Sequence, residues 1–252
     1  MDNTLVHFAT NRNEIETPNG VVDFGPRLNP RSPLWLRFGT AVMRPKADAP
    51  PAFDIEFLNV QPENISNPDD PASGPTILGS DAVFDGLRER LIGNKADLVM
   101  LLHGYACTFR EALSNAAEIK TKWATANRPL EVVVFSWPAN GTMTPLLDYT
   151  SDRDDARSSA KAIARALERF MTYLRRLPPE LQCKANIHVV AHSMGNYALR
   201  NAFQALLSTY GGHTLPRLFK NIFLMAADED SDAFELVDKM ARLPELAETV
   251  HL

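Results

Sequence analysis

The chain has 252 residues and a net charge of −5, with 45% hydrophobic and 23% charged residues. This composition suits a globular protein with a sizeable core and argues against overall disorder. The negative charge, without a stripe of basic residues, argues against a nucleic-acid-binding surface, and no apolar stretch approaches the ~18 residues that a membrane span needs.

The two cysteines, Cys107 and Cys183, form neither a disulfide framework nor a CxxC metal pair. The N-terminal sequence MDNTLVHF lacks the basic and apolar regions of a signal peptide. The sequence therefore predicts a cytoplasmic protein with one domain, residues 1–252. It leaves the oligomeric state open.

The first 80 residues contain short strand-like runs at 5–10, 34–43 and 53–60, separated by Gly, Pro and Asn turns. Most of the segment 44–80 is rich in Pro, Asp, Asn and Ser and is typical of surface loops. We expect antiparallel edge strands and a Pro-rich covering loop from this part of the chain.

From about residue 81, strand-length apolar runs alternate with helical patterns, which predicts βαβ units and a parallel sheet. The predicted helices are 155–177, and a second one from Met194 to the glycines at 211–212. Continuous apolar runs are typical of strands covered on both faces. The four runs are DLVMLLHG (97–104), LEVVVFSWP (130–138), ANIHVVAHS (185–193) and KNIFLMAAD (220–228).

The stretch Ala191-His192-Ser193-Met194-Gly195 follows a predicted strand and precedes a predicted helix. It is a relaxed form of the G-x-S-x-G nucleophile elbow, with alanine in place of the first glycine. Small neighbours permit a tight turn that exposes the serine hydroxyl at the carboxyl edge of the sheet. The pattern favours Ser193 as a nucleophile over a purely structural turn.

His103-Gly104-Tyr105 follows the strand DLVMLL. A loop at this place in α/β-hydrolases supplies an N–H group to the oxyanion hole, and glycine permits close approach to the substrate. The predicted oxyanion hole is therefore the backbone N–H of Tyr105 together with that of Met194. The alternative is that His103 and Gly104 only shape a loop.

The motifs together extend over most of the chain. They are FATNR (8–12), HGY (103–105), FSWP (135–138), DR (152–153), AHSMGN (191–196) and a segment at 224–230 similar to LxAADxD. In this order they resemble a bacterial family of α/β-hydrolases of unknown function, esterase- and lipase-like in their motifs. The resemblance implies an α/β-hydrolase fold with Ser193 as nucleophile, and it implies no particular substrate.

The catalytic histidine is the missing part of the pattern. The fold orders its triad as serine, acid, histidine, and only His213 and His251 follow Ser193. His213 comes too early, and His251 lies in ETVHL, which we expect to begin a further strand. His103 and His192 are poor substitutes, because the first belongs to a loop and the second should point away from the pocket. We expect one or two C-terminal strands, and the true base, to be absent from this sequence, or the histidine to have been lost.

Asp228, at the end of KNIFLMAAD, is the candidate catalytic acid, and a pocket-edge or helix-start residue is the alternative. The carboxylates at 228–232 do not match a calcium loop, so we expect no metal, and we interpret Ser231 or Asp232 as a helix cap.

Trp137 is a candidate for the pocket wall or for packing, and Tyr149 and Arg153 for substrate contact or for the start of a helix.

The sequence thus predicts a mostly parallel α/β-hydrolase sheet with helices on both faces, and a serine hydrolase acting on a small-molecule ester, lipid-like or acyl substrate. No Gly-rich phosphate loop is present, so no cofactor is expected. The alternative is a non-catalytic, hydrolase-like binding module or an inactive fragment.

Overall fold

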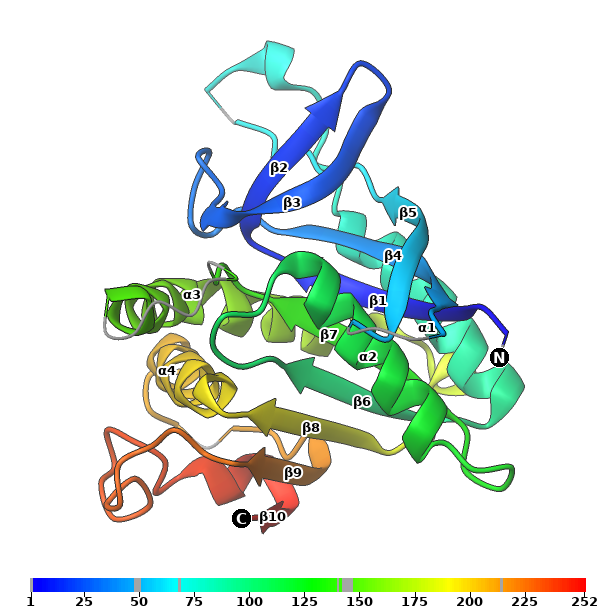
Figure 1. The fold of residues 1–252 in the computed structure, drawn as a ribbon. Helices are drawn as coiled ribbons and strands as arrows, with labels where there is room; N and C mark the ends of the chain where they lie inside the picture. The colour runs from blue at the N-terminus through cyan, green and yellow to red at the C-terminus, as the bar shows by residue number, and fades with distance from the viewer. Residues whose placement is uncertain (1, 48–50, 68, 140, 142–146, 214) are drawn as a thin grey trace.

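The structure, a computed structural model, describes residues 2–47, 51–67, 69–139, 141, 147–213 and 215–252. Four of the other positions (48–50 and 68) fall within the predicted Pro-rich loop 44–80. The described part of the chain forms an eight-stranded sheet in the order β10-β9-β8-β6-β7-β1-β4-β5 and a separate two-stranded hairpin, β2-β3 (Figure 1).

All four predicted apolar runs form strands in the parallel part of the sheet. Its strands are β6 (Asp97–Leu102), β7 (Leu130–Ser136), β8 (Ile187–His192), β9 (Phe219–Met225) and β10 (Ala247–His251). The predicted further strand at ETVHL is therefore β10, which pairs in parallel with β9 at the edge of the sheet.

The N-terminal strands divide between the two sheets. The main sheet takes up β1 (Thr4–Thr10), β4 (Arg37–Pro45) and β5 (Phe53–Val60). The predicted antiparallel edge holds for β4 and β5, but β1 lies inside the sheet, parallel to β7 and antiparallel to β4. The apolar sequence of β1 is buried along nearly its whole length, which suits an internal strand.

The hairpin of β2 (Arg12–Thr17) and β3 (Gly20–Leu28) was not among the predicted strands. Its first strand reads RNEIET, and most of that strand is at least partly exposed, so hydrophobic alternation gives little signal there.

Helices cover both faces of the main sheet, as predicted. They are α1 (Gly79–Asn94), α2 (Phe109–Trp123), α3 (Leu147–Arg176) and α4 (Met194–Thr209). α2 shares one buried cluster with β1, β6 and β7, whereas α1, α3 and α4 share the cluster on the other face. α3 begins eight residues before the predicted start, because the acidic run at 152–155 is inside the helix. None of the described helices is long and apolar enough to cross a membrane.

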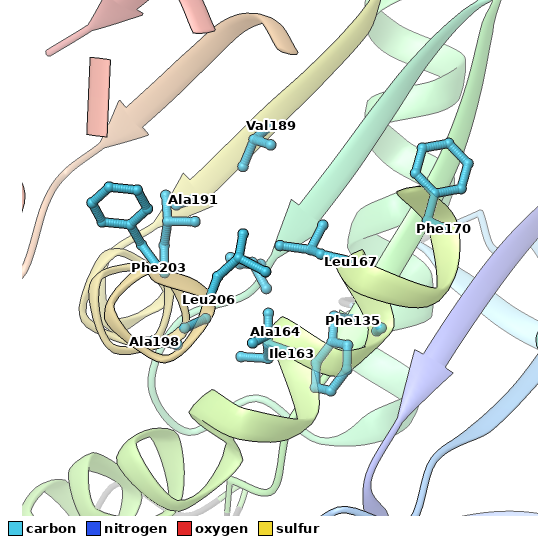
Figure 2. Packing of buried hydrophobic residues seen from close by; sticks show 14 of the residues in the cluster. Phe135, Ile163, Ala164, Leu167, Phe170, Val189, Ala191, Ala198, Phe203 and Leu206 are labelled. Atoms are coloured by element: carbon cyan, nitrogen blue, oxygen red, sulfur yellow. The ribbon is translucent and has the colours of Figure 1, made fainter. Parts of the chain in front are cut away.

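The larger core cluster fixes α3 and α4 against the sheet. Figure 2 shows Val189 and Ala191 of β8 facing Leu206 and Phe203 of α4, with Leu167 and Phe170 contributed by α3. Small side chains at Ala164 and Ala198 let the two helices approach closely. This packing holds the start of α4 in place directly behind the end of β8.

Candidate active site

The carboxyl ends of three neighbouring strands meet at one edge of the sheet. Leu102 of β6 pairs with Ala191 of β8, and His192 pairs with Met225 of β9. The loops that follow these strands therefore converge, and they include the HGY loop, the elbow and the segment that ends at Asp228.

Ser193 occupies the turn between β8 and α4, with φ 51° and ψ −124°. A non-glycine residue rarely adopts a positive φ, and such strain is typical of functional turns. The surrounding backbone holds the conformation. The Ser193 N–H donates to the Met225 carbonyl at 2.9 Å, and the Ser193 carbonyl accepts from the Asn196 side chain at 2.8 Å and from the Asp228 N–H at 3.3 Å.

The geometry explains the small residues on both sides of Ser193. A Cβ atom on Gly195 would lie 2.4 Å from the Leu102 carbonyl oxygen and 2.7 Å from that of His103. A Cβ atom on Gly104 would lie 3.0 Å from the Ser193 Cβ. Ala191 is fully buried in the core. The HGY loop and the elbow are thus in direct backbone contact.

His103 is a buried part of this loop. Its Nδ1 lies 2.9 Å from the Gly104 carbonyl oxygen, and because a carbonyl only accepts, Nδ1 carries the proton. The ring stacks on Trp137 at 4.8 Å, and the Trp137 indole N–H donates to the His103 carbonyl at 3.1 Å. Burial lowers the pKa of His103 to about 3, so the imidazole is neutral at pH 7. Trp137 is fully buried and packs under the loop instead of lining a pocket.

The two predicted oxyanion donors lie on either side of this contact. Met194 is the first residue of α4, where N–H groups have no partner within the helix. Tyr105 follows Gly104 in the HGY loop. In the described part of the chain, neither N–H donates a hydrogen bond to another protein group. Each of these two N–H groups therefore lacks a protein acceptor among the described residues.

A pocket of about 400 Å³ opens beside Ser193. The HGY loop contributes part of its wall, and Glu111, Asn115 and Glu118 of α2 contribute another part. His192 also lines this pocket and is exposed. That position differs from the sequence expectation, because the side chain of His192 faces the α2 side of the sheet, where the pocket lies.

Residues 81–252 match the sequence profile of a family described as alpha/beta hydrolase of unknown function (DUF900). The match covers more than half of the chain and includes the elbow and the HGY loop. The chain belongs to this family.

One curated protein similar to this α/β-hydrolase is the uncharacterized protein alr1448 of Nostoc sp. (strain PCC 7120 / SAG 25.82 / UTEX 2576). The two are 38% identical over 76 residues, which are 30% of this chain and 17% of the Nostoc protein. The match thus covers about a sixth of the length of that relative. No solved structure matches this α/β-hydrolase.

In this α/β-hydrolase, Asp228 lies beside the elbow but contacts a tyrosine and an arginine. The Tyr149 hydroxyl is 2.8 Å from both carboxylate oxygens of Asp228, and an Arg153 nitrogen is 3.9 Å from one of them. Partial burial and the bond to Asp228 raise the pKa of Tyr149, so its hydroxyl remains a donor at neutral pH. Tyr149 also packs edge-on against Tyr105, with ring centroids 5.7 Å apart. The sequence suggested Tyr149 and Arg153 for substrate contact or for a helix start, but it did not link them to Asp228.

The remaining histidines lie apart from Ser193. His251 is in β10, where it pairs with Phe223, and Phe223 pairs with Val190, three residues before Ser193. At about 3.3 Å per residue, His251 is roughly 10 Å short of the elbow along the strands. Its ring stacks on Phe223 at 4.5 Å, and its Nε2 is 3.1 Å from the Asn221 side-chain oxygen. His213 is exposed in the loop after α4. Among the described residues, no histidine ring is hydrogen-bonded to Ser193 or to Asp228.

The acidic run 228–232 forms ion pairs and is not followed by the helix we predicted. Residues 231–235 and 237–242 are turns, so Ser231 and Asp232 do not cap an α-helix. Lys239 bonds to both Asp230 and Asp232, and Arg200 bonds to Glu229 at 2.7 Å. Within the described ranges, no three His, Cys, Asp or Glu side chains are grouped so as to hold a metal ion.

Proposed function

We propose that this α/β-hydrolase is a serine hydrolase that acts on small-molecule carboxylic ester, lipid-like or acyl substrates, with Ser193 as the nucleophile. The observation that carries the proposal is the positive φ of Ser193 at a strand-to-helix turn, which is held by four hydrogen bonds to the Ser193 backbone. Strain of this kind persists where the surrounding fold imposes it, and it clusters at functional sites. The adjacent pocket gives a substrate access to the hydroxyl.

In the proposed reaction, the Ser193 Oγ attacks the substrate carbonyl carbon and gives its proton to a base. The carbonyl electrons move onto oxygen, and the N–H groups of Tyr105 and Met194 stabilise that charge. The tetrahedral intermediate then expels the leaving group, which takes the proton from the base. Water hydrolyses the resulting acyl-serine through the same base and the same oxyanion hole.

The base in this proposal is a histidine that is brought to Ser193 in the reacting protein, because none of the described histidine rings is hydrogen-bonded to Ser193 in this structure. Asp228 is the proposed acid, because its backbone bonds to the Ser193 carbonyl and its carboxylate lies at the same sheet edge. Its contact with Tyr149 leaves the second lone pairs of both carboxylate oxygens able to accept a further N–H.

The second candidate function is a hydrolase-like binding module that holds a ligand without turnover. The observation in its favour is that no described histidine is bonded to Ser193 or to Asp228. Without a base the serine hydroxyl is a weak nucleophile. This candidate predicts ligand binding in the pocket beside Ser193 and no covalent adduct.

The test is intact mass spectrometry after incubation with a fluorophosphonate. We expect one adduct on the wild-type chain and none on Ser193→Ala, while Ser158→Ala, which removes an exposed helical hydroxyl from α3, labels as the wild type does. Asp228→Asn should slow labelling about 100-fold or more if Asp228 is the acid. Tyr149→Phe, which removes only the hydroxyl that contacts the carboxylate, should slow it far less. An unlabelled wild-type chain that still binds an ester in the pocket would support the binding module instead.

A further inference from the structure

Arg12, the first residue of β2, is a buried charge that the proposed reaction does not use. The residue is 1% exposed, and three of the four described hydrogen bonds of its side chain go to segments distant in the chain. The guanidinium donates to the Ser136 hydroxyl at 2.9 Å, the Cys107 carbonyl at 2.6 Å, the Ala139 carbonyl at 3.2 Å and the Gly25 carbonyl at 3.3 Å. One side chain thus joins the hairpin, the end of β7 and the loop that follows β6.

Burial of this guanidinium carries a free-energy cost. Desolvation lowers the pKa of Arg12 to about 10, and nearby acidic groups offset part of that shift, so the side chain remains charged at neutral pH. In the described part of the chain, no carboxylate lies within ion-pair distance of Arg12. A methionine or leucine would fill similar space without burying a charge. Unlike these apolar side chains, arginine carries a planar fork of N–H donors.

The Arg12 bond to the Cys107 carbonyl lies in the loop after β6, which begins with the HGY residues 103–105. Two residues before Cys107 is Tyr105, the proposed oxyanion donor, and between them Ala106 has φ 51°. The Ala106 N–H donates to the fully buried Asp152 carboxylate at 3.0 Å. The strained residue is therefore held on its N-terminal side by Asp152 and on its C-terminal side by Arg12.

The far end of the loop is also fixed. Thr108 and Glu111 form a capping box at the start of α2, in which each side chain bonds to the backbone N–H of the other residue. The Arg12 bond to the Cys107 carbonyl lies between the bond of Asp152 to Ala106 and the capping box of α2. It therefore opposes rotation of the Tyr105 peptide relative to Ser193.

We infer that Arg12 is a positioning residue, which holds the 104–107 loop so that the Tyr105 N–H faces the oxyanion formed at Ser193. Arg12 acts through the backbone of the loop and does not touch the substrate. The inference rests on the proposed function of Ser193 and Tyr105. It also gives a physical reason for two sequence motifs, since Arg12 ends FATNR and Ser136 belongs to FSWP.

The first arm of the test is independent of activity. Amide hydrogen exchange of residues 104–107 is measured in the wild type, in Arg12→Lys and in Arg12→Met. We expect exchange of the Ala106 amide to be about tenfold faster or more in both variants, because lysine keeps the charge but lacks the forked donors. Arg169→Met is the matched control, since Arg169 is also largely buried but pairs with Glu63 away from the elbow. Unchanged exchange at Ala106 in folded Arg12→Lys would overturn the inference.

The second arm compares an ester with the corresponding thionoester. A thionoester develops charge on sulfur, which accepts hydrogen bonds weakly, so it gains little from an oxyanion hole. For Arg12→Lys we expect kcat/KM for the ester to fall about 10- to 100-fold, mostly in kcat, and the ester-to-thionoester ratio to fall with it. An unchanged ratio would overturn the inference. If the wild type turns over neither substrate, the proposed function fails, and the exchange arm still decides whether Arg12 positions the loop.

Discussion

Replacing Ser193 by glycine should make the protein more stable than replacing it by alanine. Both changes remove the hydroxyl, which has no hydrogen-bond partner in the described residues, so the comparison isolates the backbone. At φ 51° and ψ −124°, an alanine Cβ remains strained, whereas glycine adopts positive φ without that penalty.

The expected magnitude follows from two opposing terms. A strained conformation of this type costs about 1–3 kcal/mol, and glycine loses about 0.5–1 kcal/mol through the extra freedom of its unfolded chain. The net gain of Ser193→Gly over Ser193→Ala is therefore about 0–2.5 kcal/mol, with a middle value of about 1 kcal/mol. For a domain of this size, 1 kcal/mol corresponds to about 2–4 °C in melting temperature, which is the difference we expect.

Thermal and urea denaturation of the two variants measure this difference. The same pair of substitutions at Ser158, an exposed residue inside α3, is the control. There glycine should be less stable than alanine by about 1 kcal/mol, because the position has ordinary helical geometry. If Ser193→Gly were also no more stable than Ser193→Ala, the strain at the elbow would be refuted, and with it the main support for a nucleophile at this turn.

Two further predictions concern packing and pH. Gly195→Ala should destabilise the protein by about 1–3 kcal/mol and slow fluorophosphonate labelling, because the new methyl would meet the Leu102 carbonyl at 2.4 Å. Gly86→Ala, which meets nothing within 4 Å, should be neutral or stabilising in the same urea titration, and equal effects at both sites would contradict the clash. Burial lowers the pKa of His7 to about 4 and that of His103 to about 3. The unfolded chain therefore binds more protons than the folded one below pH ~6.5, and the free energy of unfolding should fall toward pH 4 by up to about 1.4 kcal/mol per pH unit for each histidine. His7→Leu should flatten this profile, and a profile of unchanged steepness in that variant would count against the buried neutral state.

Local sequence patterns were sufficient for the parallel half of the fold. The four apolar runs became β6 to β9, and the glycines at 211–212 follow the end of α4 with positive φ. The elbow was recognised because its requirements are local: a strand, a small residue on each side of the serine, and a helix. Backbone clashes at Gly195 and Gly104 show why small residues are needed there.

Other features had no local signal. The burial of Trp137 follows from its stacking on His103, and the exposure of His192 to the pocket follows from which face of β8 lies beside α2. Asp228 sits between Tyr149 and Arg153, which come from a helix about 75 residues earlier in the chain. A sequence pattern describes neighbours along the chain, so it could not assign these partners.

The sequence by itself determined the class of fold and the place of Ser193, because strand periodicity, helix amphipathicity and turn chemistry are set by residues close together in the chain. Only the tertiary structure placed β1 between β7 and β4, and only it brought Arg12 to the Cys107 carbonyl across 95 residues. These outcomes depend on backbone pairing and on buried hydrogen bonds between distant segments. From the sequence alone, a charged residue such as Arg12 is expected at the surface. Only the fold shows that carbonyl groups surround it.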